Sequence, residues 1–177
     1  MADGVQLALL LLTVHGVIGG IDVVVNHELV ERLPTRSGAR TEEALHSVRE
    51  AVFAVLFAGL AWFEWHGALC WLIVSLMLAE IAVSTCDEAL EDRTRRLTVF
   101  ERMTHVFLFL NFGAFLALMA PTLFRWHSLP TGLRFVNYGW LSLALSALGA
   151  AAAAWSVRDA IAHFRLGGVA ITSAASR

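Results

Sequence analysis

Histidine and carboxylate side chains recur at helical spacing in a chain that is otherwise strongly apolar. His46 and Glu50 are four residues apart, and so are Glu101 and His105, which places each pair on one helix face, about 40° apart. Imidazole nitrogens and carboxylate oxygens together are ligands that suit iron, manganese or zinc. The two pairs therefore indicate metal binding by facing helices.

The composition shows which environment must position these groups. Of the 177 residues, 58% are apolar and 16% are charged, and the mean hydropathy is +0.66. A soluble domain has about 45–50% apolar and about 25% charged residues, so we expect a membrane protein. The apolar content excludes disorder. A net charge of −2 argues against nucleic acid as a partner, and two cysteines form neither a disulfide framework nor a zinc cluster.

Five apolar stretches are long enough to cross a bilayer, for which about 20 residues are needed. They are residues 5–25, 46–65, 68–87, 99–120 and 135–157. We expect an all-α integral membrane bundle that forms one domain, residues 1–177. Short connections predict that the first four helices form an antiparallel four-helix bundle around a polar site. Small residues around Gly149 predict that the fifth helix packs closely or forms a homo-oligomer.

The distribution of arginine predicts the orientation. All 13 basic residues are Arg, and 11 of them fall on one side of the predicted spans, with only Arg125 and Arg134 on the other. The positive-inside rule then predicts a bacterial inner-membrane protein with its N-terminus outside and its C-terminus in the cytoplasm. The N-terminal stretch lacks a basic region and a small-residue cleavage site, so we expect it to be a retained span.

Ionisable residues within spans are costly, and their positions are therefore a hypothesis about function. In the antiparallel order they gather at the cytoplasmic end of the first four helices. We expect the metal ligands to be Asp22, His27, His46, Glu50, Glu80, Asp87, Glu101 and His105. We expect the residues that hydrogen-bond to these ligands to be Asn26, Glu28 and Asn111.

Each position also has a structural interpretation. Carboxylates at helix starts suit the positive end of the helix dipole, which explains Glu101 better than the deeper His105. Glu80 has an alternative role as the ion-pair partner of Arg49 or Arg102. The charged run from Glu91 to Arg96 is typical of a solvated loop, and His15 of a hydrogen-bonded histidine inside a bundle.

The ligand inventory resembles that of the ferritin-like di-iron carboxylate proteins, although their Glu/His pairs are i,i+3 and those of this chain are i,i+4. The strings NHE with ERLP, LH with RE, and EDRTRRL followed by ER and His105 also resemble a family of uncharacterised bacterial integral-membrane proteins. That resemblance covers roughly residues 22–121. Some members occur with NAD-dependent epimerase-like proteins. The resemblance implies no activity, but it implies that the matching polar residues belong to one shared site.

We therefore expect a membrane-embedded oxidoreductase, an oxidase or oxygenase, with two metal ions. Iron is the first expectation, and zinc and manganese are the others. The substrate would be hydrophobic or lipid-like, and a cytoplasmic reductase would supply electrons because the chain has no nucleotide-binding fingerprint. One alternative is a haem-binding electron-transfer protein that uses His15 and His105. Others are a zinc-dependent intramembrane hydrolase with the same ligands and a metal or proton carrier lined by Asp22, Glu80 and His15.

Overall fold

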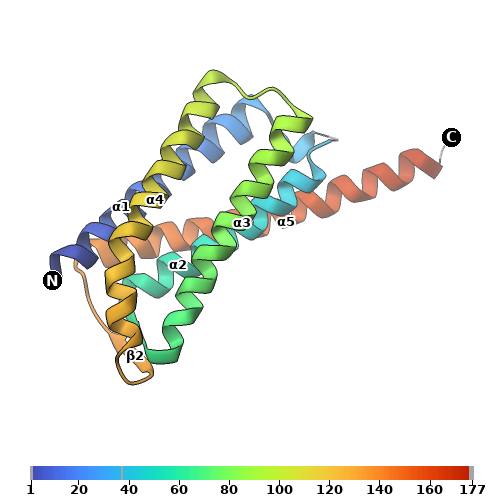
Figure 1. Ribbon diagram of the computed structural model, residues 1–177. Helices are drawn as coiled ribbons and strands as arrows, with labels where there is room; N and C mark the ends of the chain where they lie inside the picture. Colours follow the sequence, from blue (N-terminus) through green and yellow to red (C-terminus); the bar gives the residue numbers. More distant parts are fainter. Residues whose placement is uncertain (1, 37, 176–177) are drawn as a thin grey trace.

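The computed structural model describes residues 2–36 and 38–175, which are almost entirely helical (Figure 1). Helix α1 (Ala2–Asp22) continues directly into η1 (Val23–Val30), an eight-residue π-helix. The short 3-10 turn η2 (Leu33–Thr35) then leads to helix α2 (Arg40–Trp62). Helix α2 therefore begins at Arg40, earlier than the predicted start at residue 46, because charged residues extend its first turns beyond the apolar stretch.

A small two-stranded antiparallel sheet closes one end of the molecule. Strand β1 (Phe63–His66) pairs antiparallel with β2 (Gly132–Phe135), with Phe63 opposite Phe135. Between them lie η3 (Gly67–Leu69), helix α3 (Cys70–Thr94) and helix α4 (Val99–His127), and helix α5 (Trp140–Ala175) follows. Residues 63–65 and 135, which we expected within spans, thus pair as extended backbone.

The five long helices, or close extensions of them, are long and apolar enough to cross a membrane. Large apolar side chains are exposed on each, and one example from every helix is Val17, Val55, Leu78, Leu110 and Leu143. Exposed apolar surface on this scale would promote aggregation in water, whereas it is normal for a protein surrounded by lipid. The chain therefore fits a multi-pass membrane protein.

Helices α2 and α5 form the most extensive helix pair. Gly149 lets them approach closely, since a Cβ atom there would lie 3.4 Å from Ala54 O and Ala58 N. Ser47 and Ser156 reinforce the pair, each hydroxyl donating to the other residue's carbonyl oxygen, at 2.9 and 2.8 Å. The small-residue face of α5 thus packs within the chain, and its use in a homo-oligomer stays a prediction.

The other main pairs are α1 with α4 and α2 with α3, whereas α3 and α4 make few contacts with each other. A regular antiparallel bundle of the first four helices also stays a prediction. The apolar core includes Leu12, Leu56, Ile73 and Phe115, all fully buried. The buried polar residues gather mainly at the end of the molecule opposite the sheet.

Candidate metal centre

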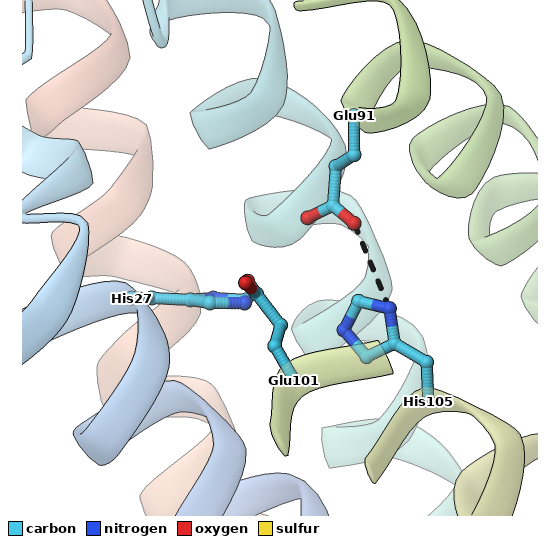
Figure 2. Close-up of side chains that lie close together, drawn as sticks. All are labelled: His27, Glu91, Glu101 and His105. Carbon is cyan, nitrogen blue, oxygen red and sulfur yellow. Dashed lines mark ion pairs between the residues drawn. The ribbon is translucent and has the colours of Figure 1, made fainter. Parts of the chain in front are cut away.

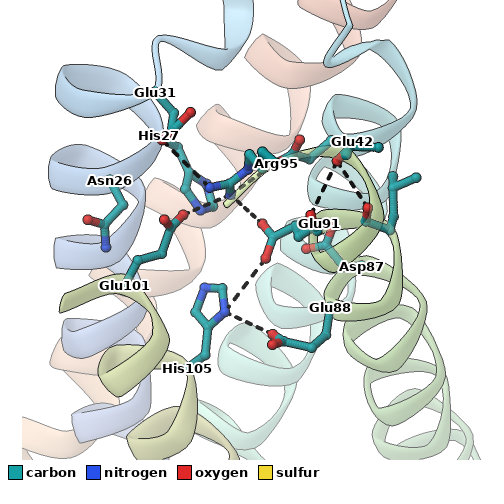
Figure 3. Close-up of polar contacts among 12 residues, drawn as sticks. Asn26, His27, Glu31, Glu42, Asp87, Glu88, Glu91, Arg95, Glu101 and His105 are labelled. Atoms are coloured by element: carbon teal, nitrogen blue, oxygen red, sulfur yellow. Dashed lines mark hydrogen bonds and ion pairs between the residues drawn. The ribbon is translucent and has the colours of Figure 1, made fainter. Parts of the chain in front are cut away.

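Buried imidazole and carboxylate groups come together where α3 connects to α4, beside η1 and the start of α2 (Figure 3). Four helical segments supply them, because consecutive helices bring their polar ends to the same level. Eight buried histidine and carboxylate residues of this region lie in contact with one another or within reach of a shared ion: Asp22, His27, Glu42, His46, Asp87, Glu91, Glu101 and His105. We call these eight residues the polar cluster.

One group within the polar cluster has the composition of a metal site (Figure 2). Each of His27, Glu91, Glu101 and His105 offers one ligand atom, and these atoms lie within 4.8 Å of one another. With metal–ligand bonds of about 2.0–2.2 Å, the ligand atoms of a tetrahedral site stand about 3.4 Å apart. The four atoms therefore lie close enough to surround a single ion once the side chains move toward it.

The same four side chains carry buried polar atoms that form no hydrogen bond among the described residues. His27 Nε2, His105 Nε2, Glu91 Oε2 and Glu101 Oε2 are buried and accept or donate no hydrogen bond within the part of the chain that the structure describes. Unpaired buried polar atoms are expensive, and native proteins seldom leave several together. Buried nitrogen and oxygen atoms that gather within 4.8 Å of one another suit a cation.

A second group overlaps the first at one residue. Glu42, His46 and Glu91 also offer ligand atoms within 4.8 Å of one another. His46 Nε2 lies 3.0 Å from Asp87 Oδ2, and the rings of His27 and His46 stack with centroids 4.3 Å apart. Glu91 therefore belongs to both groups, and its two oxygens serve different neighbours.

Arg95 occupies the point where the carboxylates converge (Figure 3). Its Nη2 lies 2.7 Å from Oε1 of both Glu91 and Glu101, and 2.9 Å from Glu42 Oε1. Burial alone would lower the pKa of Arg95, but the hydrogen bond to Glu101 and the charges of Glu91 and Glu42 outweigh it and raise the pKa. Arg95 is thus a permanent cation. It pairs with the Oε1 atoms of Glu91 and Glu101, so their Oε2 atoms stay available for a metal ion.

The π-helix η1 brings His27 into the polar cluster. In an α-helix, residues five apart point about 140° apart, so Asp22 and His27 would face different ways. The i→i+5 bonding of a π-helix, of which Glu31 N to Asn26 O at 2.8 Å is an example, widens the turn. His27 Nε2 consequently lies 3.7 Å from Asp22 Oδ2, and Asn26 Nδ2 donates to Asp22 Oδ1 at 2.7 Å.

Helix α4 is fixed by its N-terminal cap. The Thr98 hydroxyl accepts a hydrogen bond from Glu101 N at 3.1 Å, and this sets the first turn so that Glu101 faces inward. His105 follows one turn later on the same face. Its Nε2 lies 3.4 Å from Asp22 Oδ2, and its Nδ1 lies 2.9 Å from Glu88 Oε2.

The structure separates several predicted site residues from the two groups. Glu80 accepts a hydrogen bond from Ser84 Oγ, and Glu50 lies against Asp159 of α5. Glu28 forms an ion pair with Arg158. Asn111 Nδ2 donates to the Leu11 carbonyl at 2.9 Å, so it links α4 to α1 within the apolar region. Among the predicted ligands, His27, His46, Glu101 and His105 belong to the two groups, while Asp22 and Asp87 contact their histidines.

The predicted set leaves out Glu42, Glu91 and Arg95. Glu42 lies four residues before His46, and Glu91 lies four residues after Asp87, so the helical spacing itself extends to both. Predicted span ends at residues 46 and 87 placed them outside the helices. The observed helices begin at Arg40 and end at Thr94, which brings both side chains onto the inward face.

The fold and the polar cluster define a helical protein with five helices fit to cross a membrane and a buried histidine–carboxylate group at one end. Comparisons with protein-family models, curated proteins and solved structures found no match. The argument about function therefore depends on this chain's own residues.

Proposed function

We propose that this protein is a membrane-embedded oxidoreductase with a dinuclear metal centre, with iron as the metal, that acts on a hydrophobic or lipid-like substrate. The observation that carries the proposal is the sharing of Glu91 between two groups of potential ligands. A carboxylate has two oxygens and bridges two metal ions in the centres of carboxylate-rich helical proteins. Histidines and carboxylates from facing helices complete the inventory.

The charge of the polar cluster supports divalent cations. Five of its members are carboxylates, namely Asp22, Glu42, Asp87, Glu91 and Glu101. The guanidinium groups in ion-pair contact with them are Arg49, 2.8 Å from Asp87, and Arg95. When the histidines are neutral, as metal ligation requires, these two charges leave part of the carboxylate charge unbalanced, and each unpaired buried ion costs several kcal/mol. Divalent ions would remove that cost.

The chain's residues would have distinct roles around the metals. His27, Glu101 and His105 would hold one ion and Glu42 and His46 the other. Glu91 would join them, with its Oε1 atom exchanging Arg95 for the second ion. Glu88, 2.9 Å from His105 Nδ1, would orient His105, as carboxylates commonly orient ligating imidazoles. Asp22 and Asp87 face the Nε2 atoms of His105 and His46 and would be further ligands. A pair of iron ions supplies redox chemistry with dioxygen, which no side chain of the protein supplies.

The surroundings of the polar cluster agree with an apolar substrate and a membrane setting. A cavity of about 390 Å³ adjoins Asp22, Glu91 and His105, and most of its wall is apolar. We place the protein in the bacterial inner membrane with the N-terminus outside, which puts the arginine-rich connections and the polar cluster on the cytoplasmic side. Electrons would then come from a cytoplasmic reductase.

Elemental analysis of the gently purified protein tests this proposal. We expect about two iron ions per chain, and loss of both in Glu91→Ala, which removes the shared ligand. Glu42→Ala should lose about one, and Glu64→Ala, which removes a carboxylate in strand β1, should lose none. Fewer than about one bound metal per wild-type chain would overturn the proposal.

The same sample separates the alternatives. Two zinc ions in place of iron would favour the intramembrane hydrolase, since the ligands are the same and zinc has no redox chemistry. A Soret absorption band would favour the haem-binding interpretation.

A further inference from the structure

The cavity beside the polar cluster contains a polar group that the proposed metal centre does not use. The cavity extends from Asp22 and His105 into an apolar region lined by Phe53, Phe112 and Leu148. His15 lies in this apolar part and is 7% exposed. A histidine is uncommon in an apolar cavity wall. Because its ring nitrogens can form hydrogen bonds, its contacts indicate which ligands the cavity can bind.

His15 is held firmly in place. Its ring packs between Phe53 and Phe112, with ring centroids 4.8 and 5.4 Å away. Its Nδ1 atom is buried and has no hydrogen-bond partner within the described residues. A buried polar atom without a partner costs about 1–3 kcal/mol, so a ligand that satisfies it gains affinity.

The missing partner can be identified by its chemistry. A neutral imidazole has one N–H donor and one lone pair, and with the proton on Nε2 the lone pair lies on the buried Nδ1 atom. The group that pairs with this lone pair must donate a hydrogen bond. An ammonium group would lose its hydration among Phe53 and Phe112, whereas a hydroxyl group is a small neutral donor. His15 therefore selects a hydroxyl group.

The position of His15 sets the length of the ligand. His15 and Asp22 are seven residues apart on helix α1, which corresponds to about 10 Å along the axis. We propose that the cavity binds an elongated aliphatic alcohol whose hydroxyl group donates a hydrogen bond to His15 Nδ1 while its chain extends toward the polar cluster. The hydroxyl is then a recognition group, and the carbon atoms near the cluster are the reacting ones. Only this last step depends on the proposed metal centre.

Helix α1 offers a way to close the cavity without disturbing its walls. Gly19 lines the cavity, and a Cβ atom added there would meet only Leu108 Cδ2, at 4.0 Å. A leucine at position 19 would therefore extend into the cavity. Gly4, on the same helix, also has open space around an added Cβ atom and does not line the cavity, so it supplies the matched control.

The test measures binding of radiolabelled 1-dodecanol and of its methyl ether to the full chain in lipid nanodiscs. The ether has nearly the same chain but no hydrogen-bond donor. We expect the wild-type protein to bind the alcohol about 10-fold more tightly than the ether. His15→Phe should bind both with equal affinity, Gly19→Leu should bind neither, and Gly4→Leu should behave as the wild type.

Equal affinities for the alcohol and the ether in the wild type would overturn the inference, and so would a preference that survives in His15→Phe. The wild-type comparison and the Gly19→Leu variant keep the test decisive if His15→Phe does not fold. All measurements are repeated after treatment with a chelator. Selective binding of the alcohol by metal-free protein supports this inference even where the elemental analysis rejects the metal centre, so the two failures are distinguishable.

Discussion

Replacing Arg95 with methionine is the sharpest test of the charge balance in the polar cluster. The change removes one buried cation from three carboxylates, two of them 2.7 Å away and one 2.9 Å away, while keeping much of the side-chain volume. Removing one partner of a buried ion pair typically costs about 3–5 kcal/mol. In a chain of this size that loss lowers the unfolding midpoint by roughly 6 to 20 °C.

The assay is thermal unfolding in detergent, followed by circular dichroism, on protein freed of metal with a chelator. Arg93→Met is the control, because Arg93 is an exposed arginine near the same helix end. Adding Zn²⁺ as a redox-inert probe should narrow the difference between Arg95→Met and the wild type, since a divalent ion replaces the lost charge and no longer meets repulsion from the guanidinium group. A metal-free midpoint of Arg95→Met equal to that of the control would refute the reasoning.

Two further predictions concern the sheet end and the α2–α5 pair, and both are checked by the same unfolding assay. Gly67→Ala should lower the midpoint, because φ is 57° there and an added Cβ atom would lie 2.7 Å from Thr131 N, whereas Gly132→Ala, with open space, should not. Ser142→Ala should cost about 1–3 kcal/mol, because the fully buried hydroxyl donates to the Ala61 carbonyl at 2.6 Å and the variant leaves that oxygen unpaired. An unchanged midpoint in either variant would contradict its prediction.

The helices were the most predictable part of the fold. Apolar stretches of sufficient length identify all five, because in a membrane setting the backbone must satisfy its hydrogen bonds within each helix. The ends were less predictable, since charged turns such as Arg40–Glu43 and Glu91–Thr94 continue a helix without continuing its apolar character. The short sheet carries no strong local pattern, as its four-residue strands pair across a large sequence separation.

The candidate site was predictable where spacing alone decides which residues meet. The i,i+4 rule places Glu101 and His105 together, and the structure brings both into one group. It fails for His27, whose direction depends on the π-helix, and for Glu50, whose neighbour Asp159 lies on α5 beyond the predicted end of the fifth span at residue 157. Arg95 follows the end of α3, and its role depends on three carboxylates that only the folded chain assembles.

The π-helix η1 makes the polar cluster sensitive to the number of residues in this segment more than to their identity. Leu29 and Val30 are exposed there, so exchanges among apolar residues at these positions leave the inward face intact. Inserting one residue between Asp22 and His27 would instead turn His27 and every later side chain by roughly a quarter of a turn, away from the face that carries the polar cluster. Natural variation in this stretch is therefore expected as substitution, and length changes are expected beyond it, in the turn that contains η2.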